Sequence, residues 1–187
     1  MTTTLPSPFI RGPLALLLLI VLSLASGCTS YQLGAPAELP FNTVYIRPAS
    51  NHSYAPQAQA IVSSQLREHF IRDGRLKLVT SAKAADAVLT VNLTDYERRG
   101  GARRSTDTVV ASDFLTSLSA DISLYNSNKG DYFFENRRIT DHTRTYIENP
   151  YATGIRTQAY QQSEHQAMPV LARELARKIA DEVLSVW

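Results

Sequence analysis

The sequence predicts an α+β domain in which a mixed, mainly antiparallel sheet of four or five strands carries two helices packed on one face. Residues 42–80 contain a strand, an amphipathic helix and a second strand, the order of a crossover unit with parallel strands. Residues 86–145 hold three long segments of alternating apolar and polar residues, as in a half-buried antiparallel meander. The last residues repeat apolar side chains at helical spacing.

The N-terminal segment is typical of an exported precursor. Arg11 is the only charge before an apolar run at 14–24. A bilayer-spanning helix needs about 20 apolar residues, so this run favours a signal peptide. Small residues then precede Cys28, the only cysteine, with Ala25 where a bacterial lipobox usually has leucine. We predict a lipoprotein signal peptide at 1–27 and lipidation of Cys28; an ordinary secretory signal is the alternative.

The predicted mature chain begins with a tether at 28–41, rich in proline, glycine and small polar residues, followed by one domain at 42–187. Thr29 follows the cysteine, and in enterobacteria-like sorting a residue other than Asp there favours the outer membrane. Stable anchoring needs two or more acyl chains. Once Cys28 is lipidated, no thiol remains for a disulfide, a metal site or a nucleophile.

The charge balance gives no reason to expect a nucleic-acid partner. The chain has 19 Lys and Arg against 17 Asp and Glu. Because these nearly cancel, only local clusters of charge can have a binding role.

Two strands and a connecting helix are predicted in the first half of the domain. Residues 42–47 alternate and are rich in β-formers, and Pro48 ends the strand. A second short strand is predicted at 76–80. A crossover helix between them makes these two strands parallel neighbours in one sheet.

The first helix is predicted from about residue 55 to residue 72. Residues 49–54 form a turn in which Asn51 or Ser53 is the candidate N-cap. Gly74 stands in the left-handed stop position. One apolar stripe defines the buried face: Ala58, Ile61, Val62, Leu66 and Phe70.

The meander is predicted as strands at 86–96, 114–124 and 132–145. The polar, glycine-centred segment 97–108 is predicted to be an exposed hairpin loop, and 126–131 a turn. On the outer face, the predicted strands present hydroxyl and amide side chains with little charge: Thr90, Asn92, Thr94, Ser117, Ser119 and Ser123. Such a face usually meets water, and it also suits enclosure in a larger partner.

The C-terminal helix is predicted from apolar residues every four positions: Leu171, Leu175, Ile179, Val183 and Trp187. Pro169 is either its first-turn proline or lies inside a helix that begins near Tyr160. Residues 146–162 give no clear prediction.

Catalytic and metal-binding motifs are absent from the sequence. The four histidines are far apart and have no second ligand at metal spacing: His52, His69, His142 and His165. No nucleophile elbow, phosphate-binding glycine loop or zinc-protease motif is present. We therefore predict no enzyme, no metal and no cofactor.

Two arginine clusters are candidate binding residues. Arg98, Arg99, Arg103 and Arg104 flank two glycines, and guanidinium groups pair well with phosphates and carboxylates. The alternative is a solvated loop kept polar for solubility.

The second cluster is Arg137 and Arg138, with Arg144 further along the same strand. Neighbouring strand residues point to opposite faces, so Arg137 would share its face with Asp141, and Arg138 with Arg144. Cross-strand ion pairs on a wet face are the alternative to ligand binding.

Short motifs give the sequence a resemblance to the LPS-assembly lipoprotein family, LptE. They are CTSYQLG at 28–34, LPFNTVYI at 39–46, the helix end REHF at 67–70, LKLV at 76–79 and AADAVL at 84–89. The likeness covers residues 28–96 by motif and the remainder by the order of elements.

This resemblance implies an outer-membrane lipoprotein that plugs the large β-barrel LptD and binds lipopolysaccharide, with no enzymatic activity. Basic residues at one end of the sheet would bind lipid A phosphates. The Arg98–Arg104 segment is the best positional match, followed by Lys129, Arg137 and Arg138. The alternative is an envelope lipoprotein that regulates or assembles a secretion or cell-wall machine.

Overall fold

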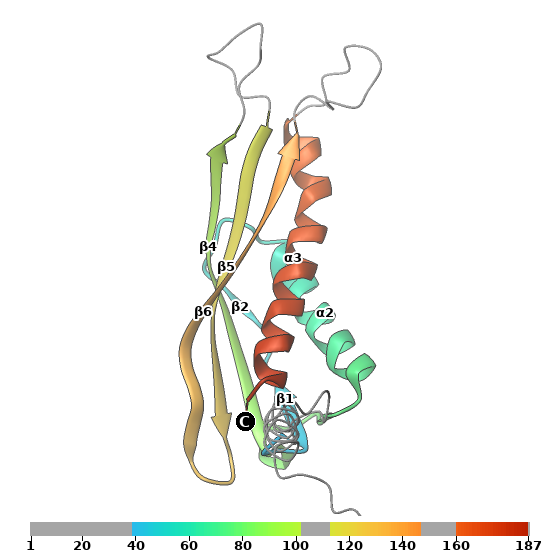
Figure 1. The fold of residues 1–187 in the computed structure, drawn as a ribbon, viewed down its shortest axis with the longest axis vertical. Coiled ribbons are helices and arrows are strands. Elements are labelled where there is room, and N and C mark those ends of the chain that lie inside the picture. The colour runs from blue at the N-terminus through green and yellow to red at the C-terminus, as the bar shows by residue number, and fades with distance from the viewer. Residues whose placement is uncertain (1–38, 102–112, 147–159, 187) are drawn as a thin grey trace, which may run out of the picture. The chain divides into compact units, whose positions relative to one another are not determined.

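The computed structural model describes residues 39–101, 113–146 and 160–186. In chain order the elements are β1 (Thr43–Ile46), β2 (Ser50–Asn51), α2 (Ala58–Asp73), β3 (Lys77–Leu78), the 3-10 helix η2 (Ala82–Ala84), β4 (Ala87–Gly100), β5 (Asp113–Asn126), β6 (Asp131–Tyr146) and α3 (Tyr160–Leu184). One mixed sheet in the order β3-β1-β4-β5-β6 has both helices on the same face (Figure 1), which confirms the predicted α+β fold. None of the helices in the described ranges combines the length and the apolarity needed to cross a membrane.

The crossover unit at the start of the domain is confirmed. β1 pairs with β3 in parallel, with Thr43 opposite Lys77, and α2 connects the two strands. β1 also pairs in parallel with β4, with Val44 opposite Ala87. Since β4 is antiparallel to β5, the sheet changes from parallel to antiparallel at β4.

The segment before α2 differs from the prediction of a simple turn. Ser50 and Asn51 form the two-residue strand β2, which pairs in parallel with β4. The Asn51 side-chain oxygen accepts from the Ser53 amide at 2.9 Å, and its amide group donates to the Ala55 carbonyl at 3.0 Å. These bonds close the turn, as asparagine side chains commonly do.

The predicted N-cap of this helix is therefore wrong, and its C-cap is confirmed. α2 begins after Gln57, which makes no side-chain cap hydrogen bond, because Asn51 and Ser53 are used in the turn before it. At the other end Gly74 has φ of 76° and its amide donates to the Phe70 carbonyl at 3.1 Å. Only glycine adopts this left-handed conformation at no steric cost.

β4 is longer than the sequence predicts. Glu97 to Gly100 were predicted as loop, but they continue the strand, with Glu97 opposite Ser117 and Gly100 opposite Phe114. Backbone hydrogen bonds to β5 hold them in the sheet although their side chains are polar. Gly101 ends this pairing by donating to the Asp113 carbonyl at 2.9 Å. The other residues of the predicted loop, 102–108, lie outside the described residues.

A β-bulge in β4 changes which residues face the helices. The register with β5 shifts between Leu93 and Asp95. Before the bulge odd-numbered residues such as Leu89 point toward the helices; after it, even-numbered residues such as Tyr96 do so, because one extra residue reverses the alternation.

The core lies between the sheet and both helices. α3 begins at Tyr160 and continues through Pro169, which confirms the second of the two predicted alternatives. The described residues of its apolar repeat are all buried, and Trp187 lies outside the described range. The largest fully buried side chains come from all three parts: Leu66 and Phe70 of α2, Leu89, Leu118 and Ile122 of the sheet, and Leu171, Leu175 and Ile179 of α3.

Candidate functional site

The candidate site lies on the face of β4, β5 and β6 that faces away from α2 and α3 (Figure 1). We call it the open face, since no described helix covers it. The cross-strand pairs Thr90–Ser123 and Asn92–Asp121 place polar side chains there. The hydroxyl-rich outer face predicted from the sequence is therefore present.

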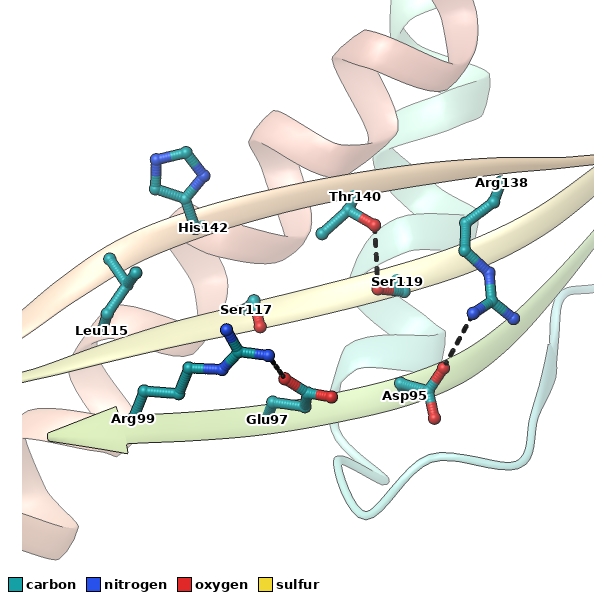
Figure 2. Close-up of a pocket in the computed structure, with 9 residues that line it drawn as sticks. All are labelled: Asp95, Glu97, Arg99, Leu115, Ser117, Ser119, Arg138, Thr140 and His142. Carbon is teal, nitrogen blue, oxygen red and sulfur yellow. Dashed lines mark hydrogen bonds and ion pairs between the residues drawn. The ribbon is translucent and has the colours of Figure 1, made fainter.

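Beyond the bulge, the open face holds a groove of about 380 Å³ (Figure 2). Three strands contribute side chains in cross-strand rows. The lining residues are Asp95, Glu97 and Arg99 from β4, Leu115, Ser117 and Ser119 from β5, and Arg138, Thr140 and His142 from β6. Leu115 is the one apolar side chain in this set.

Arg138 of β6 is held in place by carboxylates of β5 and β4. Its Nε and Nη2 donate to the two oxygens of Asp121 at 2.8 and 3.1 Å, and its Nη1 lies 3.5 Å from Asp95 Oδ2. The hydrogen bond from Arg138 lowers the pKa of Asp121, and the same contact raises the pKa of Arg138. This forked contact fixes the orientation of the guanidinium plane.

The other charged side chains of the groove are also balanced. Arg99 Nη2 lies 2.9 Å from Glu97 Oε2 on the same strand. Between these two arginines, the hydroxyls of Ser119 and Thr140 are 2.9 Å apart across β5 and β6. The two acids and two arginines of the groove carry equal and opposite charge, so the surface offers many hydrogen-bonding groups and little net charge.

The arginines predicted from the sequence divide between the two faces. Arg98 points to the helix side, where its Nη1 lies 3.6 Å from Glu164 Oε2 of α3; the other oxygen of Glu164, Oε1, accepts from Tyr96 Oη at 2.5 Å. Arg99, the next residue, lines the open-face groove. Neighbouring residues of one strand thus cannot act on the same surface.

Arg137 and Arg138 separate in the same way, as predicted. Arg137 pairs with Glu182 of α3 and lies 4.6 Å from the centre of the Phe134 ring. Asp141 shares this helix side, with its Oδ1 2.6 Å from Lys178 Nζ. Arg138 lies on the open face.

The remaining predicted binding residues do not join this groove in the described part of the chain. Lys129 lies in the turn between β5 and β6, whereas Gly100 is paired with the start of β5. At about 3.3 Å per residue, the length of β5 separates these ends by roughly 40 Å. Arg103 and Arg104 lie outside the described residues.

The sequence did not identify five residues of the groove: Asp95, Glu97, Leu115, Thr140 and His142. Asp95 and Glu97 reach the open face only because of the bulge, and Thr140 and His142 meet them only through the strand register. The alternation on β6, which correctly placed Arg138, was the one signal that could have found Thr140 and His142.

The described residues contain no group of three or more His, Cys, Asp or Glu side chains arranged to hold a metal ion. The chemistry that the groove offers is therefore polar binding: carboxylates that accept, guanidinium groups that donate, and hydroxyls that do both.

Comparison with known proteins gives a match to one family model and a set of solved structures with a similar fold. The family model LptE, described as Lipopolysaccharide-assembly, matches residues 41–184. A comparison with curated protein sequences finds no match.

Similar solved structures support the fold. An uncharacterized lipoprotein B from Nitrosomonas europaea has 16% identity and a TM-score of 0.50, over 82% of this chain and 87% of that one. A hypothetical protein from Chlamydia trachomatis has 12% identity and a TM-score of 0.53, over 78% and 97%. A protein from Xanthomonas campestris has 9% identity and a TM-score of 0.52, over 81% and 88%.

Proposed function

Because the chain belongs to the LptE family of lipopolysaccharide-assembly lipoproteins, which are not enzymes, we propose that it is the outer-membrane lipoprotein that plugs an LptD-type barrel and binds lipopolysaccharide. The family match over residues 41–184, nearly the whole described domain, is the observation that carries this proposal. The sequence before it supplies the anchor: a signal peptide at 1–27, a lipidated Cys28 and a tether at 28–41.

The charge pattern of the open face supports enclosure in a larger partner. A protein that is inserted into a barrel exchanges water for the partner's wall, and an unpaired charge that is buried there costs several kcal/mol. Here Arg138 is paired with Asp121 and Asp95, and Arg99 with Glu97. The hydroxyls between them remain able to bond to polar groups of a partner.

The lipid A phosphates would be bound at the end of the sheet where Gly100 pairs with Phe114. Arg98 and Arg99 lie at this end, and Arg103 and Arg104 follow within a few residues of sequence. Arg99 is well exposed, at 76% of its side chain, and exposed ion pairs contribute only about 0–1 kcal/mol, so a phosphate can replace Glu97 as its partner. Lys129, Arg137 and Arg138 are weaker candidates because they lie elsewhere.

The first test is to purify the mature, lipidated protein from its native outer membrane and to identify what is bound by mass spectrometry. A large β-barrel in near one-to-one amount is expected. A secretion component, a cell-wall synthase or no partner would contradict the proposal and favour a regulator or assembly factor.

The second test addresses the ligand. Reversing the charge of Arg98, Arg99, Arg103 and Arg104 together is expected to weaken lipopolysaccharide binding by at least tenfold, because several phosphate contacts are removed at once. A matched control reverses four arginines that are exposed on the helices: Arg67, Arg72, Arg173 and Arg177. Equal loss in both variants would indicate a general effect of charge, and unchanged affinity would contradict the assignment of these arginines.

A further inference from the structure

We propose that the open-face groove binds a phosphate-free saccharide in the row around Arg138, separately from the arginine-rich end of the sheet that would bind phosphates. This inference rests on the proposed function, since the family's printed description names a lipopolysaccharide, a molecule with acyl chains, phosphates and sugars. The side chains that line the groove favour one of these three parts. Its volume of about 380 Å³ is in the range of about 300–1,000 Å³ that is typical of ligand sites.

An acyl chain matches this groove less well than a polar ligand does. Eight of the nine lining residues are polar or charged, and Leu115 at one end is the exception. An acyl chain laid over Ser117, Ser119 and Thr140 would remove their hydroxyls from water and give no hydrogen bond in return, which is costly.

A phosphate gains little in the row around Arg138, because this guanidinium group is already occupied by carboxylates. Arg138 makes a forked contact with Asp121. It also pairs with Asp95 (Figure 2). An incoming phosphate would have to displace a carboxylate and would then lie close to two negative groups. Arg99 lies opposite Leu115, at the end of the groove next to Gly100, so a phosphate bound by Arg99 stays outside the row around Arg138.

A saccharide matches the hydrogen-bond donors and acceptors that the groove offers. Each sugar hydroxyl donates one hydrogen bond and accepts others, so it needs donors and acceptors close together. Asp95 on β4, Ser119 on β5 and Thr140 on β6 lie in one cross-strand row, and Arg138 lies beside it (Figure 2). The carboxylate can accept from neighbouring sugar hydroxyls, while the hydroxyls of Ser119 and Thr140 can donate or accept.

The test uses the core oligosaccharide of lipopolysaccharide after removal of both acyl chains and phosphates. It is titrated into the mature domain, and backbone amide shifts are followed by NMR. We expect the largest shifts at Ser117, Ser119, Thr140 and His142, and the same shifts of these groove amides when the phosphates are left in place.

A pair of matched variants separates this groove from the remainder of the open face. Ser119→Ala with Thr140→Val removes both central hydroxyls, and we expect about tenfold weaker oligosaccharide binding. The control is Thr90→Val with Ser123→Ala, another hydroxyl pair opposite each other on β4 and β5, on the other side of the bulge from the groove. The control is expected to bind as the unaltered protein does, and equal loss in both variants would overturn the assignment.

Failure of this inference is distinguishable from failure of the proposed function. Whole lipopolysaccharide that binds without groove shifts, or oligosaccharide that shifts only the arginine-rich end, would overturn the saccharide site and leave the proposed function intact. Groove amides that respond to a purified barrel but to no oligosaccharide would also overturn it, in favour of a protein contact. Loss of both barrel and lipopolysaccharide binding would contradict the proposed function itself.

Discussion

The two faces of β4, β5 and β6 hold their side chains by different means. Toward the helices, Leu118 and Ile122 are completely buried against α2 and α3, and the stabilisation comes from apolar burial. Toward the open side, the neighbouring residues Ser119 and Asp121 are half-buried and bond to side chains of β6. The helix face supplies most of the stability of the fold. Side chains of the open face can therefore be replaced at little cost in stability, and we expect binding there.

The largest expected effect comes from breaking the helix face. Leu118→Ala removes a fully buried side chain and leaves a cavity, which should lower the free energy of unfolding by about 3 kcal/mol. The matched change on the open face is Ser119→Ala at the next residue, expected within about 0.5 kcal/mol of the unaltered protein. Urea denaturation measures both, and similar losses would contradict the division between the faces.

Unlike the carboxylates of the open face, Asp86 joins three parts of the chain. One Asp86 oxygen accepts from the Thr43 hydroxyl at 2.8 Å and the Thr43 amide at 2.9 Å, and the other accepts from the Asn128 side chain at 3.2 Å. These hydrogen bonds, chiefly that from the Thr43 side chain, lower the pKa of Asp86 to about 2, from 3.8.

This lowered pKa predicts a pH-dependent stability. The charged carboxylate is favoured in the folded state, so its contribution is complete well above pH 3.8 and is lost as the pH falls toward 2. Asp86→Asn is expected to cost about 1–2 kcal/mol at pH 7 and much less at pH 2. Thermal unfolding at several pH values tests this, with Asp131→Asn in the adjacent turn as the control. A pH-independent difference would contradict the assigned cause.

The third prediction concerns the ion pair between Asp141, which is buried, and the partly exposed Lys178 of α3. Asp141 is only 8% exposed and lies 2.6 Å from Lys178 of α3. Lys178→Met keeps the side-chain length and removes the charge, leaving this carboxylate without its cation, and is expected to cost about 1–2 kcal/mol. Arg177→Met, which breaks exposed contacts within α3, is expected to change stability negligibly. Chemical denaturation measures the free energy of unfolding of both variants. An unchanged free energy for Lys178→Met would contradict the role of the pair.

The predictability of the two faces differs for a physical reason. Apolar alternation identifies the helix face correctly at Leu89, Leu118 and Ile122, because burial requires apolar side chains there. Polar alternation is a weaker signal, since almost any polar residue is tolerated facing water. For this reason Glu97 to Gly100 were predicted as loop although they are strand.

The groove could be predicted only in part. Alternation along β6 places Arg138 and Asp141 on opposite faces, as observed. The bulge between Leu93 and Asp95 leaves no mark in the sequence, because inserting one polar residue into a polar stretch costs little. Since the bulge decides that Arg99 faces the groove and Arg98 faces α3, the division of the arginine cluster had to come from the structure.

The smallest expected effect compares the neighbours Arg137 and Arg138. Arg138→Gln breaks the forked contact with Asp121, but both groups are in contact with water, so the Tm should stay within about 2 °C of the unaltered protein. Arg137→Gln removes the contact with Glu182 of α3 and the packing of the guanidinium on the Phe134 ring, and a Tm lower by about 2–4 °C is expected. Differential scanning calorimetry at two salt concentrations measures both. A larger loss for Arg138→Gln would mean that the open face holds the sheet together, and in that case its charges could not be exchanged freely for contacts with a partner or ligand.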